Sequence, residues 1–132
     1  MEFGESNRWE GTLAQSDRGV KFLHNSIVQT LLVFAVLPII GCIGLLAYFV
    51  HPSEASIVLH YNVYFGVDLL GLWWQAYALP MLGLLFVAGH YILARRFYES
   101  AERIACYLML FSSGLLSFGL FVAGISVAFI NY

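Results

Sequence analysis

The sequence lacks positive charge over most of its length. No lysine or arginine occurs from Phe22 to Ala94, and none follows Arg103. Only 11% of the 132 residues are charged, whereas 61% are hydrophobic. Because about a quarter of the residues in a typical soluble domain are charged, this composition argues against a water-soluble fold. It is typical of a membrane protein.

Three long segments contain no charged residue at all. They comprise residues 27–50, 69–94 and 104–130. A hydrocarbon core of about 30 Å needs roughly 20 helical residues to cross it. Backbone groups in lipid must find their hydrogen-bond partners within the protein, which favours helices. The sequence therefore predicts an all-α integral membrane protein with three transmembrane helices, forming one domain over residues 27–132.

The six basic residues all lie on one side of these segments. Three precede the first segment, and three lie within residues 95–103. Short loops rich in lysine and arginine stay in the cytoplasm. We therefore expect a multi-pass protein of the cytoplasmic (inner) membrane, with its amino terminus inside and its carboxyl terminus outside. Residues 1–26 form a cytoplasmic segment, residues 51–68 an outer loop and residues 95–103 a cytoplasmic loop.

Signatures of catalysis, redox chemistry and ion transport are missing. Cys42 and Cys106 are expected at different depths and make no disulfide framework. No ionisable residue lies near the middle of a segment, as an ion pathway requires. The chain is therefore predicted to be non-enzymatic and to hold no metal or cofactor. One alternative is a haem- or pigment-binding redox subunit using His24 and His90, because membrane haems are often held by two histidines on different helices.

Small residues form a stripe on the third segment. Ser113, Ser117, Gly124 and Ala128 fall on one face of a helix with about 100° per residue. Small side chains let helix backbones approach closely in a membrane. We expect this stripe to pack against another helix, either of the same chain or of a partner subunit.

Two prolines lie inside the apolar segments. Proline has no backbone N–H and leaves the carbonyl four residues earlier without its helical partner. We expect Pro38 to bend the first helix and Pro80 to bend the second, where the carbonyl of Ala76 is released.

The outer loop is the most individual part of the chain. Residues 57–65 are rich in β-branched and aromatic side chains, which favours either an extended segment or a short interfacial or re-entrant one. Gly66 permits a sharp turn, and Asp68 is predicted to cap the second helix at its amino terminus. Trp73 and Trp74 are expected in an aromatic belt at the outer membrane surface.

The motif His60-Tyr-Asn-x-Tyr-Phe-Gly-x-Asp68 resembles a stretch in small uncharacterised bacterial membrane proteins. Those proteins also have few spans, a proline in the second helix and a basic loop after it. The similarity covers roughly residues 57–96. It implies a bacterial multi-span membrane protein and brings no function with it.

The outer loop therefore holds the binding candidates. They are His60, Tyr61, Asn62, Tyr64, Asp68, Trp73 and Trp74. They are predicted to cap the bundle or to recognise a partner subunit, a lipid or a small ligand. We expect a small integral membrane subunit or assembly partner of a larger membrane complex. The alternative is a homo-oligomer with its own function. The expected partners are membrane lipid and other membrane subunits or further copies of the chain, and not nucleic acid.

Overall fold

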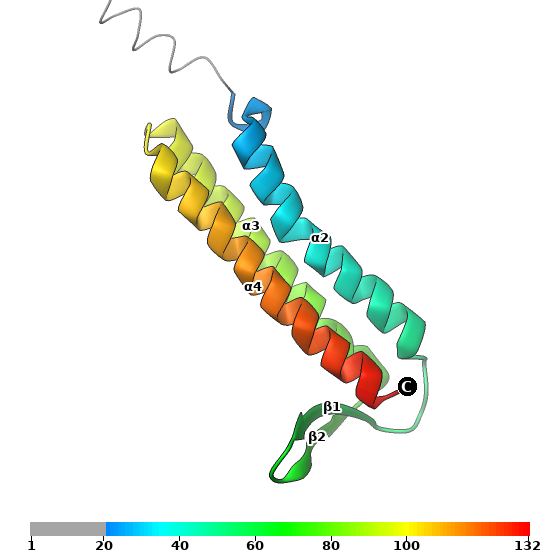
Figure 1. The fold of residues 1–132 in the computed structure, drawn as a ribbon. Helices are drawn as coiled ribbons and strands as arrows, with labels where there is room; N and C mark the ends of the chain where they lie inside the picture. Colours follow the sequence, from blue (N-terminus) through cyan, green and yellow to red (C-terminus); the bar gives the residue numbers. More distant parts are fainter. Residues whose placement is uncertain (1–20) are drawn as a thin grey trace, which may run out of the picture.

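The computed structural model describes residues 21–132, and this part of the chain is mainly helical. It contains the helices α2 (Ser26–Phe49), α3 (Ala78–Glu99) and α4 (Arg103–Ile130). Figure 1 shows them side by side in an elongated bundle. With the 3₁₀ helix η2 (Trp73–Tyr77) leading into α3, three helical stretches are long and apolar enough to cross a membrane. The predicted three apolar helices are therefore present.

The chain is mostly helical, as expected of an all-α protein, and it also contains a small sheet. The strands β1 (Ile57–Asn62) and β2 (Gly66–Gly71) form a two-stranded antiparallel sheet at one end of the bundle. The extended alternative for residues 57–65 agrees with β1. The predicted start of the second helix at Leu69 is wrong, because that residue pairs with His60 across the sheet. Helical structure begins only at Trp73.

The first helix begins at a capped residue. Asn25 has an extended backbone, and its Oδ1 accepts hydrogen bonds from the N–H groups of Ile27 at 2.9 Å and Val28 at 3.4 Å. These N–H groups have no partner within the helix, so the side chain satisfies them. The 3₁₀ helix η1 (Phe22–His24) lies just before. Of the predicted cytoplasmic segment, residues 1–20 lie outside the described residues.

The two intramembrane prolines play different roles. Pro38 lies well inside α2, whereas Pro80 is the third residue of α3. N–H groups in the first turn of a helix have no intrahelical acceptor, so proline is tolerated there. Pro80 therefore stands close to where the 3₁₀ turn gives way to the α-helix, and not inside a long helical run as Pro38 does.

A short turn reverses the chain between α3 and α4. Ala101 takes a left-handed backbone conformation with φ of 64°, and the Glu102 N–H donates to the Phe97 carbonyl at 2.9 Å. Such a turn satisfies carbonyl groups left free at a helix end. Because α3 runs back along the bundle, α2 and α4 run in the same direction (Figure 1).

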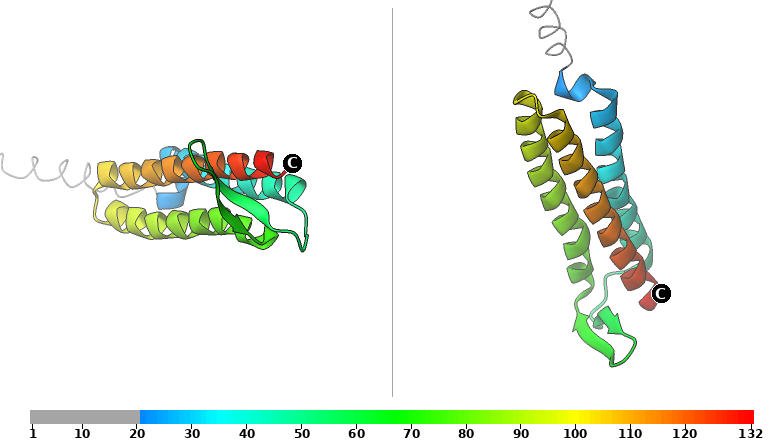
Figure 2. Two further views of the ribbon diagram at one scale, coloured as in Figure 1. Left: turned by 90° about the horizontal axis from the view of Figure 1, so that it is seen from below. Right: turned by 60° about the vertical axis from the view of Figure 1, so that its left-hand side comes forward.

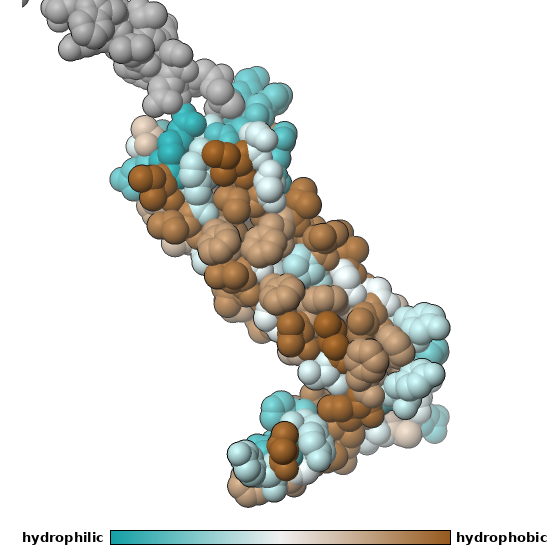
Figure 3. Space-filling model, viewed as in Figure 1, coloured by the Kyte–Doolittle hydropathy of each residue, from teal (hydrophilic) through white to brown (hydrophobic). Residues whose placement is uncertain are grey.

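This chain path gathers the described basic residues at one end. Lys21 precedes α2, Arg95 and Arg96 lie in the last turns of α3, and Arg103 begins α4. Figure 3 shows hydrophilic residues at this end and hydrophobic residues along the helices. The sheet lies at the other end (Figures 1 and 2).

Hydrogen bonds organise the basic end of the bundle. Asn25 Nδ2 donates to the Tyr107 hydroxyl at 3.0 Å, which joins the start of α2 to α4. Arg103 donates to the Tyr98 hydroxyl at 2.8 Å, and its guanidinium lies 4.2 Å from the centre of the same ring. Arg95 pairs with Glu99 at 2.9 Å, one helical turn apart. The bonds of Asn25 and Arg103 therefore hold this end together.

The predicted stripe of small residues on α4 is buried, and α2 packs closely against this helix. Ser113, Ser117 and Ala128 are each at most 1% exposed, and Gly124 is also buried. A Cβ atom on Gly124 would lie only 2.5 Å from the Cys42 sulfur on α2. Both serine hydroxyls are buried without a hydrogen-bond partner among residues 21–132. The small size of serine, and not its hydroxyl group, therefore explains why it fits at these two positions.

The contact at Gly124 can be tested with a matched glycine. Gly124→Ala should destabilise the bundle by about 1–3 kcal/mol, because the added methyl group overpacks the contact with Cys42. Gly119→Ala is the control, since a Cβ there meets nothing within 4 Å and the gain in helix propensity is the same. Unfolding by denaturing detergent measures both changes. Equal stability of the two variants would contradict the close approach, and Cys42→Ala should rescue Gly124→Ala.

Candidate functional site

The candidate site is the hairpin arm, which comprises residues 57–71. A tight connection joins its strands: Asn62 Oδ1 accepts a hydrogen bond from the Tyr64 N–H at 2.9 Å, and Gly66 has φ of 80°. An asparagine side chain bonded two residues ahead stabilises a turn, and glycine takes positive φ without strain. Figure 1 and the left view of Figure 2 show the arm running across the direction of the helices.

The pairing of the two strands is irregular. The register shifts between Val58 and His60 and again between His60 and Tyr61. Such bulges increase the local twist and redirect side chains. The alternating pattern expected of a regular strand is therefore interrupted in the middle of the arm.

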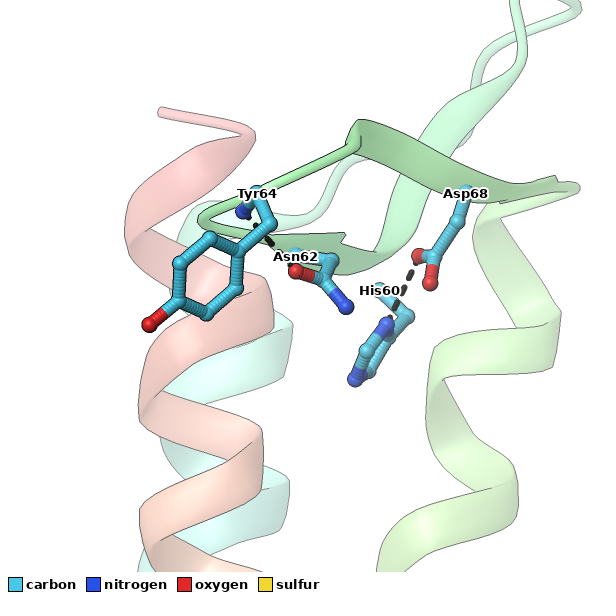
Figure 4. Close-up of polar contacts among 4 residues, drawn as sticks. All are labelled: His60, Asn62, Tyr64 and Asp68. Carbon is cyan, nitrogen blue, oxygen red and sulfur yellow. Dashed lines mark hydrogen bonds and ion pairs between the residues drawn. The ribbon is translucent and has the colours of Figure 1, made fainter.

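His60 and Asp68 come together across the sheet. His60 Nδ1 lies 2.7 Å from Asp68 Oδ1, and the two side chains are 62% and 42% exposed. Figure 4 shows both side chains on the side of the arm that faces the helices. The predicted helix cap at Asp68 is therefore wrong: this residue lies within β2, and its carboxylate pairs with His60 instead.

The last turn of α4 fastens the arm to the bundle. Asn131 Oδ1 accepts from the Val58 N–H at 2.8 Å, and its Nδ2 donates to the Val58 carbonyl at 2.7 Å. The same Nδ2 lies 2.8 Å from the carbonyl of Val127. One amide side chain thus satisfies both backbone groups of Val58, as a neighbouring strand would. Sequence reasoning missed Asn131, because nothing local links it to a residue 73 positions earlier.

Packing at the base of the arm adds a second attachment. Ile57, Leu59 and Trp73 lie against a buried cluster formed by the ends of α2 and α4 together with Ala76. Gln75 Oε1 accepts from the Leu72 N–H at 2.8 Å. A Cβ atom on Gly71 would meet this same oxygen and the end of the Leu59 side chain, so both side chains would have to move to admit a larger residue.

The seven predicted binding residues do not form one pocket. His60 and Asp68 pair, whereas Asn62 serves the turn. Trp73 packs against the cluster at the base of the arm, with Tyr77 at 6.4 Å between ring centres, while Trp74 is 55% exposed. The remaining two, both tyrosines, are exposed on the arm.

Tyr61 pairs with Val67 across the sheet, so the two side chains share one face of the arm. Their exposed fractions are 50% and 48%. The register shift between His60 and Tyr61 separates this pair from the His60–Asp68 contact along the arm.

The two histidines proposed as haem ligands have different settings. His24 is exposed in η1. His90 Nδ1 lies 2.7 Å from the Phe86 carbonyl, four residues earlier in α3. Among residues 21–132, no group of three or more histidine, cysteine or acidic side chains is arranged to hold a metal. The hydrogen bond to Phe86, within α3, accounts for the position of the His90 ring.

Removal of the Asn131 attachment should loosen the arm. Asn131→Ala leaves the N–H and C=O of Val58 without these partners, at an expected cost of about 1–3 kcal/mol. Hydrogen exchange at the Val58 amide should accelerate by roughly tenfold for each 1.4 kcal/mol. Asn62→Ala, which disturbs only the turn, is the control and should leave this amide protected. Unchanged exchange in Asn131→Ala would show that the side chain does not hold the arm.

The His60–Asp68 pair should contribute little to stability. Both side chains are largely exposed to solvent, and exposed pairs are worth about 0.2–1 kcal/mol. A double-mutant cycle with His60→Ala and Asp68→Ala measures their coupling energy directly. A coupling well above this range would indicate that the pair is buried in the assembled protein.

Comparisons with known proteins identify no relative. The chain matches no protein-family model, and neither a curated protein nor a solved structure is similar to it. The resemblance to small bacterial membrane proteins therefore stays a prediction.

Proposed function

We propose that the chain is a non-enzymatic subunit or assembly partner of a larger complex in the cytoplasmic membrane, with its amino terminus inside and its carboxyl terminus outside. The orientation is supported by Lys21, Arg95, Arg96 and Arg103, which gather at one end of the bundle. The opposite end carries no lysine or arginine. By the positive-inside rule the basic end faces the cytoplasm, so the hairpin arm lies on the outer side.

The role as a subunit is supported by the way polar side chains are used. Asn25 caps α2 and reaches α4, Asn131 fastens β1, and Gln75 caps the 3₁₀ helix η2 that follows the arm. These hydrogen bonds fix the positions of segments of the fold relative to one another. They give the bundle a rigid outer projection, which is what preorganised recognition requires.

The observation that carries the proposal is the exposed face of Tyr61 and Val67. Both side chains are about half exposed on a fixed sheet that projects beyond the helices. Neighbouring exposed apolar side chains can form part of an interaction site, and tyrosine is among the residues that most often dominate binding energy at interfaces. A neighbouring membrane subunit is the partner we favour, and a second copy of the chain is the alternative.

Native mass spectrometry of the complex after gentle extraction tests the subunit role. A mass that combines this chain with a different protein is the expected result. Tyr61→Ala should release the chain from that complex, whereas Tyr64→Ala, a matched change at the tip of the arm, should not. A wild-type monomer would contradict the proposal. A homo-oligomer would support the alternative, and added haem mass would support a redox subunit.

The topology has a separate test by cysteine labelling in intact cells. A membrane-impermeant reagent should modify Ser56→Cys from outside and spare Ser100→Cys, since these exposed positions lie at opposite ends of the bundle. The native Cys42 and Cys106 are buried and provide a low background. Labelling of position 100 from outside would reverse the proposed orientation.

A further inference from the structure

The tip of the hairpin arm carries three consecutive large side chains that nothing in the fold explains. Val63, Tyr64 and Phe65 are 83%, 90% and 84% exposed. The turn itself is built by Asn62 and Gly66. Residues at such positions are ordinarily small or polar, so these three side chains are suited to an environment other than water.

The position of the arm indicates which environment this is. The chain leaves α2 at Phe49 and becomes helical again at Trp73, so the arm stands at the level where the spans end. It runs across the helices in Figure 1 and in the left view of Figure 2, and the right view of Figure 2 shows it beyond their ends. This is the position expected of an element that lies along the surface of a membrane crossed by the helices. Figure 3 shows it projecting past the side of the bundle, with a recess between them.

The side chains on the bundle side of the arm suit a lipid interface. Figure 4 shows the ring of Tyr64 pointing from the arm toward the side on which the helices lie. Tyrosine combines an apolar ring with a polar hydroxyl and is enriched where hydrocarbon meets water. His60 and Asp68, on the same side, bond to each other. The absence of lysine and arginine from residues 22–94 leaves no cationic attraction to anionic lipid.

We propose that the tip, comprising Val63, Tyr64 and Phe65, is an interfacial anchor that inserts among the lipid head groups of the outer leaflet beside the bundle. The lipid-facing surface of the helices then continues onto the arm, and the apolar tip is covered by membrane. The inference rests on the proposed topology only for the name of the leaflet.

The test uses the purified full-length protein in phosphatidylcholine vesicles, at less than one molecule per vesicle. An environment-sensitive fluorophore is attached to Phe65→Cys, or to Val63→Cys as an independent position. Its emission should shift to shorter wavelength and be quenched by lipids that carry a nitroxide near the head group. Val67→Cys, a half-exposed position within β2 and outside the tip, is the control and should be quenched by iodide in the water instead. Wild-type protein taken through the same labelling reports any background from Cys42 and Cys106.

Two further measurements decide between lipid and other occupants. Tyr64→Asp should reduce the lipid quenching of the label at position 65, and addition of phosphatidylglycerol should leave it unchanged. Iodide quenching at position 65 equal to that at position 67 would overturn the anchor and leave a protein partner or second copy to cover the tip. If phosphatidylglycerol changes the lipid quenching at position 65, the proposal that the tip inserts without attraction to anionic lipid is overturned. Because no partner is present, failure here leaves the subunit proposal standing.

Discussion

The close approach of α2 and α4 is the constraint on which the rest of the structure depends. Helices in lipid gain little from hydrophobic burial, so dispersion contacts at small residues hold them together. Gly114 faces the ring of Phe34 and Gly124 faces the sulfur of Cys42, with no room for a side chain at either glycine. Since these helices run in the same direction, their last turns lie at the same end of the bundle, where Val50 and Val127 share one buried cluster.

That shared end makes an ordered hairpin possible. A two-stranded sheet alone in water is marginally stable. Here Asn131 binds one edge of β1, and Ile57 and Leu59 pack on the cluster at the ends of α2 and α4. The bulges in the pairing twist the strands and make the arm a poor template for further strand addition. Its shape and position are therefore set by the bundle more than by its own ladder.

The helices could be predicted from the sequence because lipid leaves the backbone few alternatives. The extended alternative for residues 57–65 agrees with β1, but β2 and the position of the arm could not be predicted, because they depend on distant partners. Leu69 and Leu70 extend the apolar run that precedes Trp73, and only pairing with β1 makes them a strand. Asp68 precedes that run, as a helix cap would, yet its partner is His60. The link from Asn131 to Val58 has no local signal in the sequence.

The two ends of the bundle use tyrosine in different ways. At the basic end, the hydroxyls of Tyr98 and Tyr107 receive hydrogen bonds from Arg103 and Asn25, and the rings pack within the cluster around Cys106. On the arm, Tyr61 and Tyr64 are exposed and contribute little to the packing of the bundle. The packing of the bundle accounts for the tyrosines at the basic end and leaves the exposure of the two on the arm without an explanation inside the described residues. Their exposure supports the proposal that contacts outside the chain are made at the hairpin end.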